Sequence, residues 1–161
     1  MPAMSAKELS AESVHDFSVT LSLLEGYSFR IDFDDEALEP LHSDESPPLG
    51  RGTGPSPSRL LAAAVANCLA SSLLFCLRRS RVDVREMKAK ARVTLGRNAR
   101  GRLRVQRIDV ELDPSLPPGH VDQLARCKGV FEDYCTVTAS IRDGITIAAS
   151  VVTIPERSES P

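Results

Sequence analysis

Residues 58–79 read SRLLAAAVANCLASSLLFCLRR, and this run of small and apolar side chains decides the fold. Ser58 stands just after Pro57, where its hydroxyl can accept a hydrogen bond from an unpaired backbone N–H at a helix N-terminus. The run therefore predicts a helix from about Ser58 to Arg79. Because apolar residues occur on nearly every side of this helix, we expect other elements to surround it at the centre of the fold.

The segment from Leu60 to Leu77 is also the one candidate for a membrane span. Five of its residues are alanine, and Asn67, Ser71 and Ser72 interrupt it near the middle. A buried core helix is therefore the favoured interpretation, and no membrane partner is expected.

Alternating patterns before the helix predict strands. Apolar residues occupy every second position over residues 15–23 and again over residues 27–33, with Glu25-Gly26 between them. This pattern predicts a β-hairpin with one buried face. The next segment, residues 34–57, is rich in acids, proline and glycine, so we expect a loop there.

A second hairpin is expected after the helix, over residues 87–95 and 103–112. The apolar phase slips within the returning strand, between Val105 and Ile108, which predicts a β-bulge near Gln106 or Arg107. Helical spacing then runs over residues 121–134, although Gly129 weakens that pattern.

The end of the domain is less clearly patterned. Residues 135–142 are ambiguous between strand and helix, and residues 145–154 predict a final strand. The resulting order of elements, ββ-α-ββ-α-β, predicts an α+β fold in which an antiparallel sheet wraps around the long helix.

Length and composition favour one domain. The 161 residues are 42% hydrophobic, which is sufficient for a core. We expect the domain to span residues 14–154, with flexible tails at residues 1–13 and 155–161. The net charge of −2 gives no general attraction for nucleic acid. The first sixteen residues lack the apolar stretch of a secretory signal, so a cytoplasmic location is expected.

Four cysteines are present, and without a secretory signal a structural disulfide framework is not expected. Cys68 and Cys76 would lie about 12 Å apart along the predicted helix, too far for a disulfide. The same argument disfavours a bond between Cys127 and Cys135 if residues 121–134 are helical. Any working pair therefore takes one cysteine from each half of the chain.

The neighbours of the four cysteines differ. Cys76 and Cys127 lie within apolar patterns and are interpreted as core residues. Cys68 has small or polar neighbours that leave room for a ligand. Cys135 stands at a boundary between two elements, where free backbone N–H groups would favour a thiolate. A catalytic pair of Cys68 and Cys135 is one interpretation, and two inert thiols remain the alternative.

A metal site is not predicted. The three histidines, His15, His42 and His120, are far from one another in the sequence, and no CxxC pair exists. No cofactor is expected either.

Two stretches, GTGPSPSRLLAAAVANC at residues 52–68 and FEDYC at residues 131–135, carry a resemblance. They resemble the OsmC/Ohr family of osmotically inducible and organic-hydroperoxide-resistance proteins, as does the order of elements over residues 14–152. The resemblance implies an intertwined homodimer in which two sheets wrap around paired central helices. It also implies two active sites at the subunit interface.

The resemblance further implies a thiol peroxidase that reduces organic hydroperoxides and possibly hydrogen peroxide. It assigns Cys68 as the thiolate that attacks the peroxide and Cys135, at the start of a short helix, as the resolving partner. A dithiol reductant of the lipoyl or thioredoxin type would then restore both thiols. An apolar lining from Leu61, Leu69 and Phe131 would suit an alkyl tail.

One position departs from the family pattern. Peroxide-reducing members carry a glutamate at the helix start that holds an arginine against the reactive sulfur, and Ser58 stands there in this chain. Arg30 is the candidate for the supporting cation, and Asp44 or Glu45 is the candidate for the missing carboxylate.

Two other classes of function therefore stay open. One is a non-catalytic OsmC-like dimer that binds an apolar small molecule in the same pocket. The other is a protein that uses one cysteine alone, as a redox sensor or a thiol-dependent hydrolase.

Overall fold

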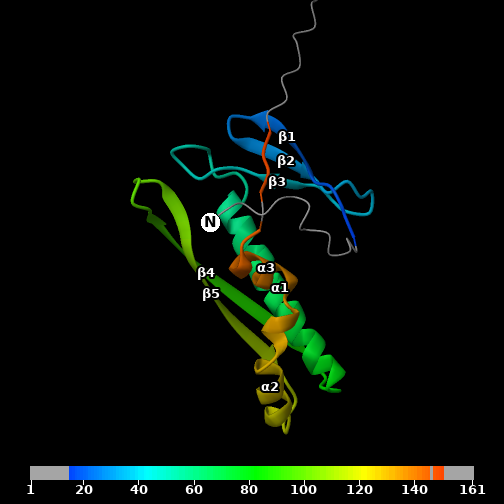
Figure 1. Ribbon diagram of the computed structural model, residues 1–161. Coiled ribbons are helices and arrows are strands. Elements are labelled where there is room, and N and C mark those ends of the chain that lie inside the picture. The colour runs from blue at the N-terminus through cyan, green and yellow to red at the C-terminus, as the bar shows by residue number, and fades with distance from the viewer. Residues whose placement is uncertain (1–14, 146, 151–161) are drawn as a thin grey trace, which may run out of the picture. The chain divides into compact units, whose positions relative to one another are not determined.

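The computed structural model describes residues 15–145 and 147–150 (Figure 1). The chain divides into two compact units, Met1–Leu61 and Ala62–Pro161. The described strands form two antiparallel sheets, one of three strands and one of two. The predicted α+β class is confirmed, and each unit is described below by itself.

The first unit holds the three-stranded sheet, in the order β1-β2-β3. Strands β1 (Thr20–Glu25) and β2 (Ser28–Asp32) form the predicted hairpin, which turns at Gly26 with a φ of 55°. Strand β3 (Leu41–Ser43) lies inside the segment that was predicted to be a loop. That prediction was wrong there because three residues are too few to show an alternating pattern, yet their backbone pairs with β2.

The long helix α1 extends over Pro57–Arg79. Pro57 is its first residue, a position where the missing N–H of proline costs nothing. The backbone carbonyl of the buried Ser56 accepts a hydrogen bond from the Leu60 N–H at 3.0 Å. The helix therefore begins after Ser56, and the predicted cap at Ser58 was two residues too late.

Only one face of α1 is buried. Its buried residues recur at helical spacing, while Leu61 is 36% exposed and Phe75 is 56% exposed. The prediction of a helix surrounded by other elements was therefore wrong for the single chain. Length and apolar composition alone would also allow α1 to cross a membrane. The buried face comprises Ala62, Val65, Ala66, Leu69, Ser72, Leu73 and Leu77.

The second unit contains the hairpin of β4 (Glu86–Arg97) and β5 (Leu103–Ser115). Thr94 pairs with Arg107 and Leu95 pairs with Val105, so Gln106 is the extra residue of a β-bulge. The bulge lies where the slip in the apolar phase predicted it.

Three short helical segments follow the hairpin: α2 (Val121–Lys128), the 3₁₀ helix η1 (Phe131–Tyr134) and α3 (Thr136–Asp143). The single helix predicted over residues 121–134 was wrong because the α-helix ends before Gly129. There the Gly129 N–H bonds to Arg126 O at 3.1 Å, which is the tightened geometry of a helix end.

The predicted last strand is not found in the described residues 145 and 147–150, which have no regular secondary structure. A strand needs a paired neighbour, and the alternating pattern alone does not supply one. The rest of that prediction, residues 151–154, lies outside the described residues. The two predicted tails, residues 1–13 and 155–161, also lie outside them.

Two apolar clusters in the second unit hold α1 against the elements that follow it. One is built around Leu73, Leu77, Val82 and Cys127, and the other around Val65, Leu69 and Cys135. Phe131 and Leu112 pack against both. The clusters thereby bring the middle of α1 next to the chain around Cys135, although the two segments are far apart in the sequence.

Candidate functional site

The free thiols of Cys68 and Cys135 meet in the second unit. Cys68 lies in the middle of α1, and Cys135 is the residue before the first turn of α3. Cys68 packs against the apolar cluster that contains Cys135, and each thiol shifts the pKa of the other. The fold therefore brings together the two cysteines that the sequence singled out, one from each half of the chain.

Several donors act on the sulfur of Cys135. Burial alone would raise its pKa, but hydrogen bonds from Cys68, Thr138 and Ser72 outweigh burial, so the pKa is lowered from the ordinary value. Cys135 Sγ lies 3.0 Å from Thr138 Oγ1; the thiol donates in this hydrogen bond, and the hydroxyl would donate to a thiolate. Cys135 is therefore the sulfur that carries negative charge most readily.

The pKa of Cys68 shifts in the opposite direction. Burial and the interaction with Cys135 raise its pKa, while the backbone N–H groups of Val137 and Thr138 act to lower it. These N–H groups belong to the first turn of α3, where they have no partner within the helix. The titrations of the two thiols are therefore linked, and Cys135 loses its proton before Cys68 does.

Solvent access distinguishes the two sulfurs. Cys135 is 0% exposed, whereas Cys68 is partly exposed. Leu69 and Phe131 pack in the cluster around them, as the predicted apolar lining requires, but Leu61 is not a member of that cluster. A small molecule that enters from solvent would meet Cys68 first.

Arg30 is engaged by a neighbouring carboxylate within the first unit. Its Nε donates to both carboxylate oxygens of Asp32, at 3.0 and 2.9 Å, and its Nη2 donates to one of them at 2.8 Å. Asp32 thereby raises the pKa of Arg30. The partner of Arg30 is thus a residue of its own strand, and not Asp44 or Glu45.

Asp44 organises the loop after β3. Its carboxylate accepts hydrogen bonds from the backbone N–H groups of Arg51 and Thr53, both at 3.1 Å, and from the Thr53 hydroxyl at 3.0 Å. The Thr53 N–H has the largest effect, and together these donors lower the pKa of Asp44 despite its burial. In the structure Asp44 holds its own loop together, whereas the sequence suggested that it pairs with an arginine.

The remaining two candidates have local partners as well. The Glu45 backbone carbonyl accepts from the Gly52 N–H at 2.9 Å, within the same loop. The Ser58 hydroxyl lies 3.2 Å from the Ser56 hydroxyl, one on each side of Pro57. The first contact closes the loop, and the second lies at the start of α1.

Sequence reasoning missed the donors Ser72 and Thr138. Ser72 is four residues after Cys68 on α1, a spacing that places both on one face of a helix. Thr138 is three residues after Cys135, the spacing at which a helix-capping residue meets the first turn. Both spacings are visible in the sequence once Cys68 and Cys135 are chosen as the candidate pair.

Cys76 and Cys127 are joined by a disulfide, with Cα atoms 5.7 Å apart. The interpretation of both as core residues is correct, because they belong to one apolar cluster. The expectation of no structural disulfide was wrong. It rested on the cell compartment, whereas the bond depends on α1 and α2 placing the two side chains within reach.

Among residues 15–145 and 147–150, no three histidine, cysteine or acidic side chains gather in a cluster that could hold a metal ion.

The chain matches the family model of OsmC-like proteins over residues 50–150. Solved structures share its fold, although their sequences differ widely. An OsmC-like protein from Vibrio cholerae is 16% identical, with a TM-score of 0.69 over 79% of this chain and 94% of its own. An OsmC-like protein from Mycoplasma pneumoniae is 13% identical, with a TM-score of 0.68 over 81% and 89%.

A third solved structure bears a functional name. It is an organic hydroperoxide resistance protein from Legionella pneumophila, 16% identical, with a TM-score of 0.59 over 81% of this chain and 92% of its own. No curated protein sequence matches the chain significantly. The family match over residues 50–150 includes both free cysteines, and the chain belongs to the OsmC-like protein family.

Proposed function

We propose that this chain is a thiol peroxidase that reduces organic hydroperoxides with Cys68 and Cys135. The observation that carries the proposal is that two free thiols, Cys68 of α1 and Cys135 at the start of α3, pack together in one apolar cluster. Membership of a family that includes organic hydroperoxide resistance proteins supports it.

Cys68 is proposed to attack the peroxide because it is the partly exposed sulfur. Because Cys135 is the more acidic thiol, it ionises first, and its thiolate accepts the proton of Cys68 in an uphill step that precedes the attack. The Cys68 thiolate then attacks one oxygen of the O–O bond, an alcohol leaves, and Cys68 becomes a sulfenic acid.

The second half of the cycle uses Cys135 as the nucleophile. Its thiolate attacks the sulfenic sulfur of Cys68, water leaves, and a disulfide joins the two residues. An external dithiol of the lipoyl or thioredoxin type then reduces this disulfide by exchange and is itself oxidised.

Hydrogen-bond donors are proposed to stabilise the negative charge in place of an arginine. The groups that most strongly lower the pKa of the two thiols are the first-turn N–H groups of α3 and the hydroxyls of Thr138 and Ser72. Arg30, the cation that the family pattern suggested, already binds Asp32. Leu69 and Phe131 offer an apolar surface to the alkyl part of the substrate.

We further propose that the working form is a homodimer. All six residues of β1 are exposed in the single chain, including the apolar Leu21 and Leu23. Their alternating pattern is typical of a strand with one buried face, which a second copy of the chain would cover.

The decisive experiment is mass mapping of the cysteines after one equivalent of cumene hydroperoxide. We expect a Cys68–Cys135 disulfide as the main new product, because Cys135 packs in one apolar cluster with Cys68 and intercepts the sulfenic acid. Cys135→Ser is the matched control and should stop at mono-oxidised Cys68. Unmodified thiols in the native chain would contradict the peroxidase proposal.

A non-catalytic dimer that binds an apolar molecule is the second candidate. Ser58 at the helix start favours it, because the glutamate that holds an arginine against the reactive sulfur in peroxide-reducing members is absent there. In that case, cumene hydroperoxide would leave Cys68 reduced.

The acidity of the pair provides a pH test. A lowered pKa of Cys135 means that its thiolate exists above that pKa and is lost as the pH falls through it. The ultraviolet absorbance of the thiolate should therefore titrate below the range of an ordinary cysteine. Cys68→Ala removes one donor and should move the midpoint upward. An unchanged midpoint in Cys68→Ala would show that the titrations of the two thiols are not linked.

A further inference from the structure

Two cysteine pairs connect the same two stretches of chain. Cys68 and Cys76 lie eight residues apart on α1, and Cys127 and Cys135 lie eight residues apart on the segment that runs from α2 to α3. The outer pair is bonded, with Cα atoms 5.7 Å apart, and in the inner pair Cys68 packs against the apolar cluster that contains Cys135. The bond therefore ties the chain that leads to Cys135 against the helix that carries Cys68.

Helix α2 has little else to hold it in place. It is eight residues long, and Cys127 is its buried residue. Helices shorter than about 12 residues are marginal in water without tertiary contacts. Its first turn also lacks a side-chain cap. The disulfide is thus the covalent anchor of α2, beside the packing of Leu124 against the same apolar cluster.

A movement of α2 would be transmitted to Cys135 through the packing of Phe131. This residue lies between Cys127 and Cys135 in the sequence and packs against both apolar clusters. One cluster contains Cys127 and the other contains Cys135. Loss of the anchor at Cys127 would therefore loosen the packing that places Cys135 beside Cys68.

We propose that Cys76 and Cys127 form a second redox site, a disulfide that a dithiol reductant opens and that, while closed, holds Cys135 within reach of Cys68. The opening of this bond does not depend on peroxidase activity. Its positioning effect on Cys135 rests on the function proposed above.

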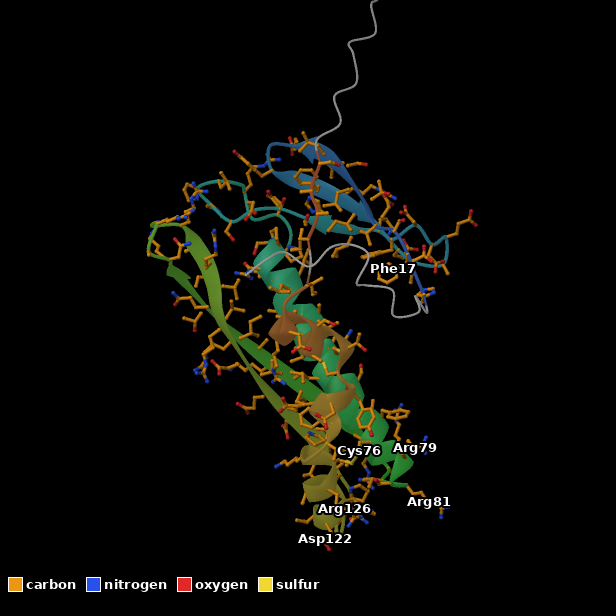
Figure 2. The ribbon with its side chains drawn as sticks, in the orientation of Figure 1. Phe17, Cys76, Arg79, Arg81, Asp122 and Arg126 are labelled. Carbon is orange, nitrogen blue, oxygen red and sulfur yellow. A yellow bond between two sulfur atoms is a disulfide. The ribbon has the colours of Figure 1, made fainter. Side chains whose placement is uncertain are left out.

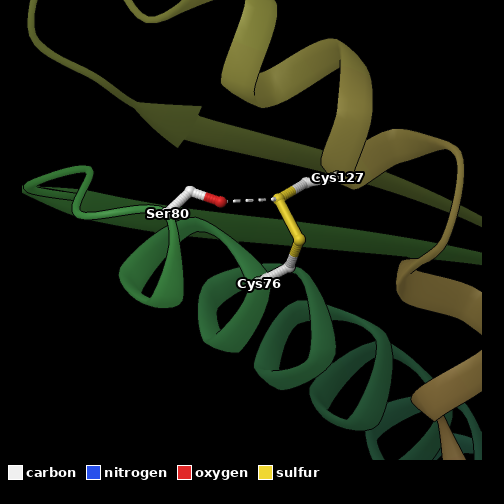
Figure 3. The surroundings of a disulfide bond; sticks show 3 residues. All are labelled: Cys76, Ser80 and Cys127. Atoms are coloured by element: carbon white, nitrogen blue, oxygen red, sulfur yellow. Dashed lines mark hydrogen bonds between the residues drawn. A yellow bond between two sulfur atoms is a disulfide. The ribbon is translucent and has the colours of Figure 1, made fainter.

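The two sulfurs of the bond differ in access, which sets the direction of exchange. Cys76 is partly exposed, whereas Cys127 is 0% exposed. A reductant thiolate would attack Cys76 Sγ, breaking the S–S bond and releasing the Cys127 thiolate. Ser80 Oγ lies 3.9 Å from Cys127 Sγ and can donate a hydrogen bond to it (Figure 3).

The second thiol of the reductant completes the exchange. It attacks the reductant sulfur in the mixed disulfide and releases Cys76 as a thiolate. The reductant leaves as a cyclic or protein disulfide, and its two protons pass to Cys76 and Cys127.

Basic residues lie at the end of α1 that bears this bond. Its last turn contains Arg78 and Arg79, and Arg79 is labelled at the same end of the second unit as Cys76 and Arg126 in Figure 2. Positive charge attracts the thiolate form of an incoming reductant.

The test uses the full chain with Cys68→Ala, so that the inner pair cannot bond. Mass mapping after mild oxidation should find a peptide cross-linked through Cys76 and Cys127, and dithiothreitol should open it. On reduction, hydrogen exchange over residues 121–135 should rise on the order of tenfold, because α2 loses its anchor. Peptides from β4 and β5 should keep their protection and thereby report an intact fold.

Absence of the cross-linked peptide, or equal exchange over residues 121–135 in both redox states, would overturn the proposal. The positioning effect is measured separately in Cys76→Ala/Cys127→Ala, which retains Cys68 and Cys135. Peroxide should form the Cys68–Cys135 disulfide roughly tenfold more slowly in this variant. An unchanged rate would overturn the positioning effect. If Cys68 resists peroxide even in the native chain, the peroxidase proposal fails while the exchange result stands.

Discussion

Replacement of Cys68 by serine is expected to lower dithiol-dependent reduction of cumene hydroperoxide by at least about 10³-fold. A serine hydroxyl does not ionise near neutral pH, so the variant lacks the nucleophile that attacks the O–O bond. The rate is measured as loss of hydroperoxide at a dithiothreitol concentration at which mass mapping still finds the Cys76–Cys127 disulfide closed. Turnover by Cys68→Ser at the native rate would place the peroxide chemistry elsewhere.

Two further variants show which step of the reaction is lost in Cys68→Ser. Ser71→Ala changes an exposed residue of the same helix, whose hydroxyl donates to Asn67 Oδ1 at 3.3 Å, and should retain native turnover. Cys135→Ser should still consume one equivalent of peroxide, because Cys68 remains, but it should not form the intramolecular disulfide. This pattern separates attack by Cys68 from resolution by Cys135.

Removal of the Cys76–Cys127 disulfide is expected to lower the free energy of unfolding by about 4 kcal/mol. The bond closes a sequence separation of 51 residues, and the estimate follows from the chain entropy that such a loop restores to the unfolded state. Denaturant unfolding of the native chain with and without dithiothreitol measures the difference. Equal stability in both conditions would contradict the prediction.

Single and double alanine variants distinguish the bond from the packing of its sulfurs. Cys76→Ala and Cys127→Ala each break the same bond, so the double variant should cost little more than either single one. If the residues contributed only as separate core side chains, the two losses would add. Dithiothreitol should have little effect on any of the three variants, because none of them can form the bond.

Local patterns were sufficient for most of the elements. The run over residues 58–79 placed α1 to within one residue, and the slip in apolar phase located the bulge at Gln106. These features depend on backbone periodicity and on residues adjacent in the chain, which a sequence displays directly. The resemblance to the OsmC/Ohr family supplied the short helix after Cys135 and the choice of Cys68 and Cys135, which pattern alone had left open.

The partner of each functional side chain was decided by the three-dimensional structure. The Cys76–Cys127 bond, the role of Asp44 in its loop and the pairing of Arg30 with Asp32 each depend on where a side chain points. The sequence showed that a working pair takes one cysteine from each half of the chain, but four pairs satisfy that condition. Periodicity reports which face of an element a residue occupies, whereas the neighbour on that face depends on how the elements pack.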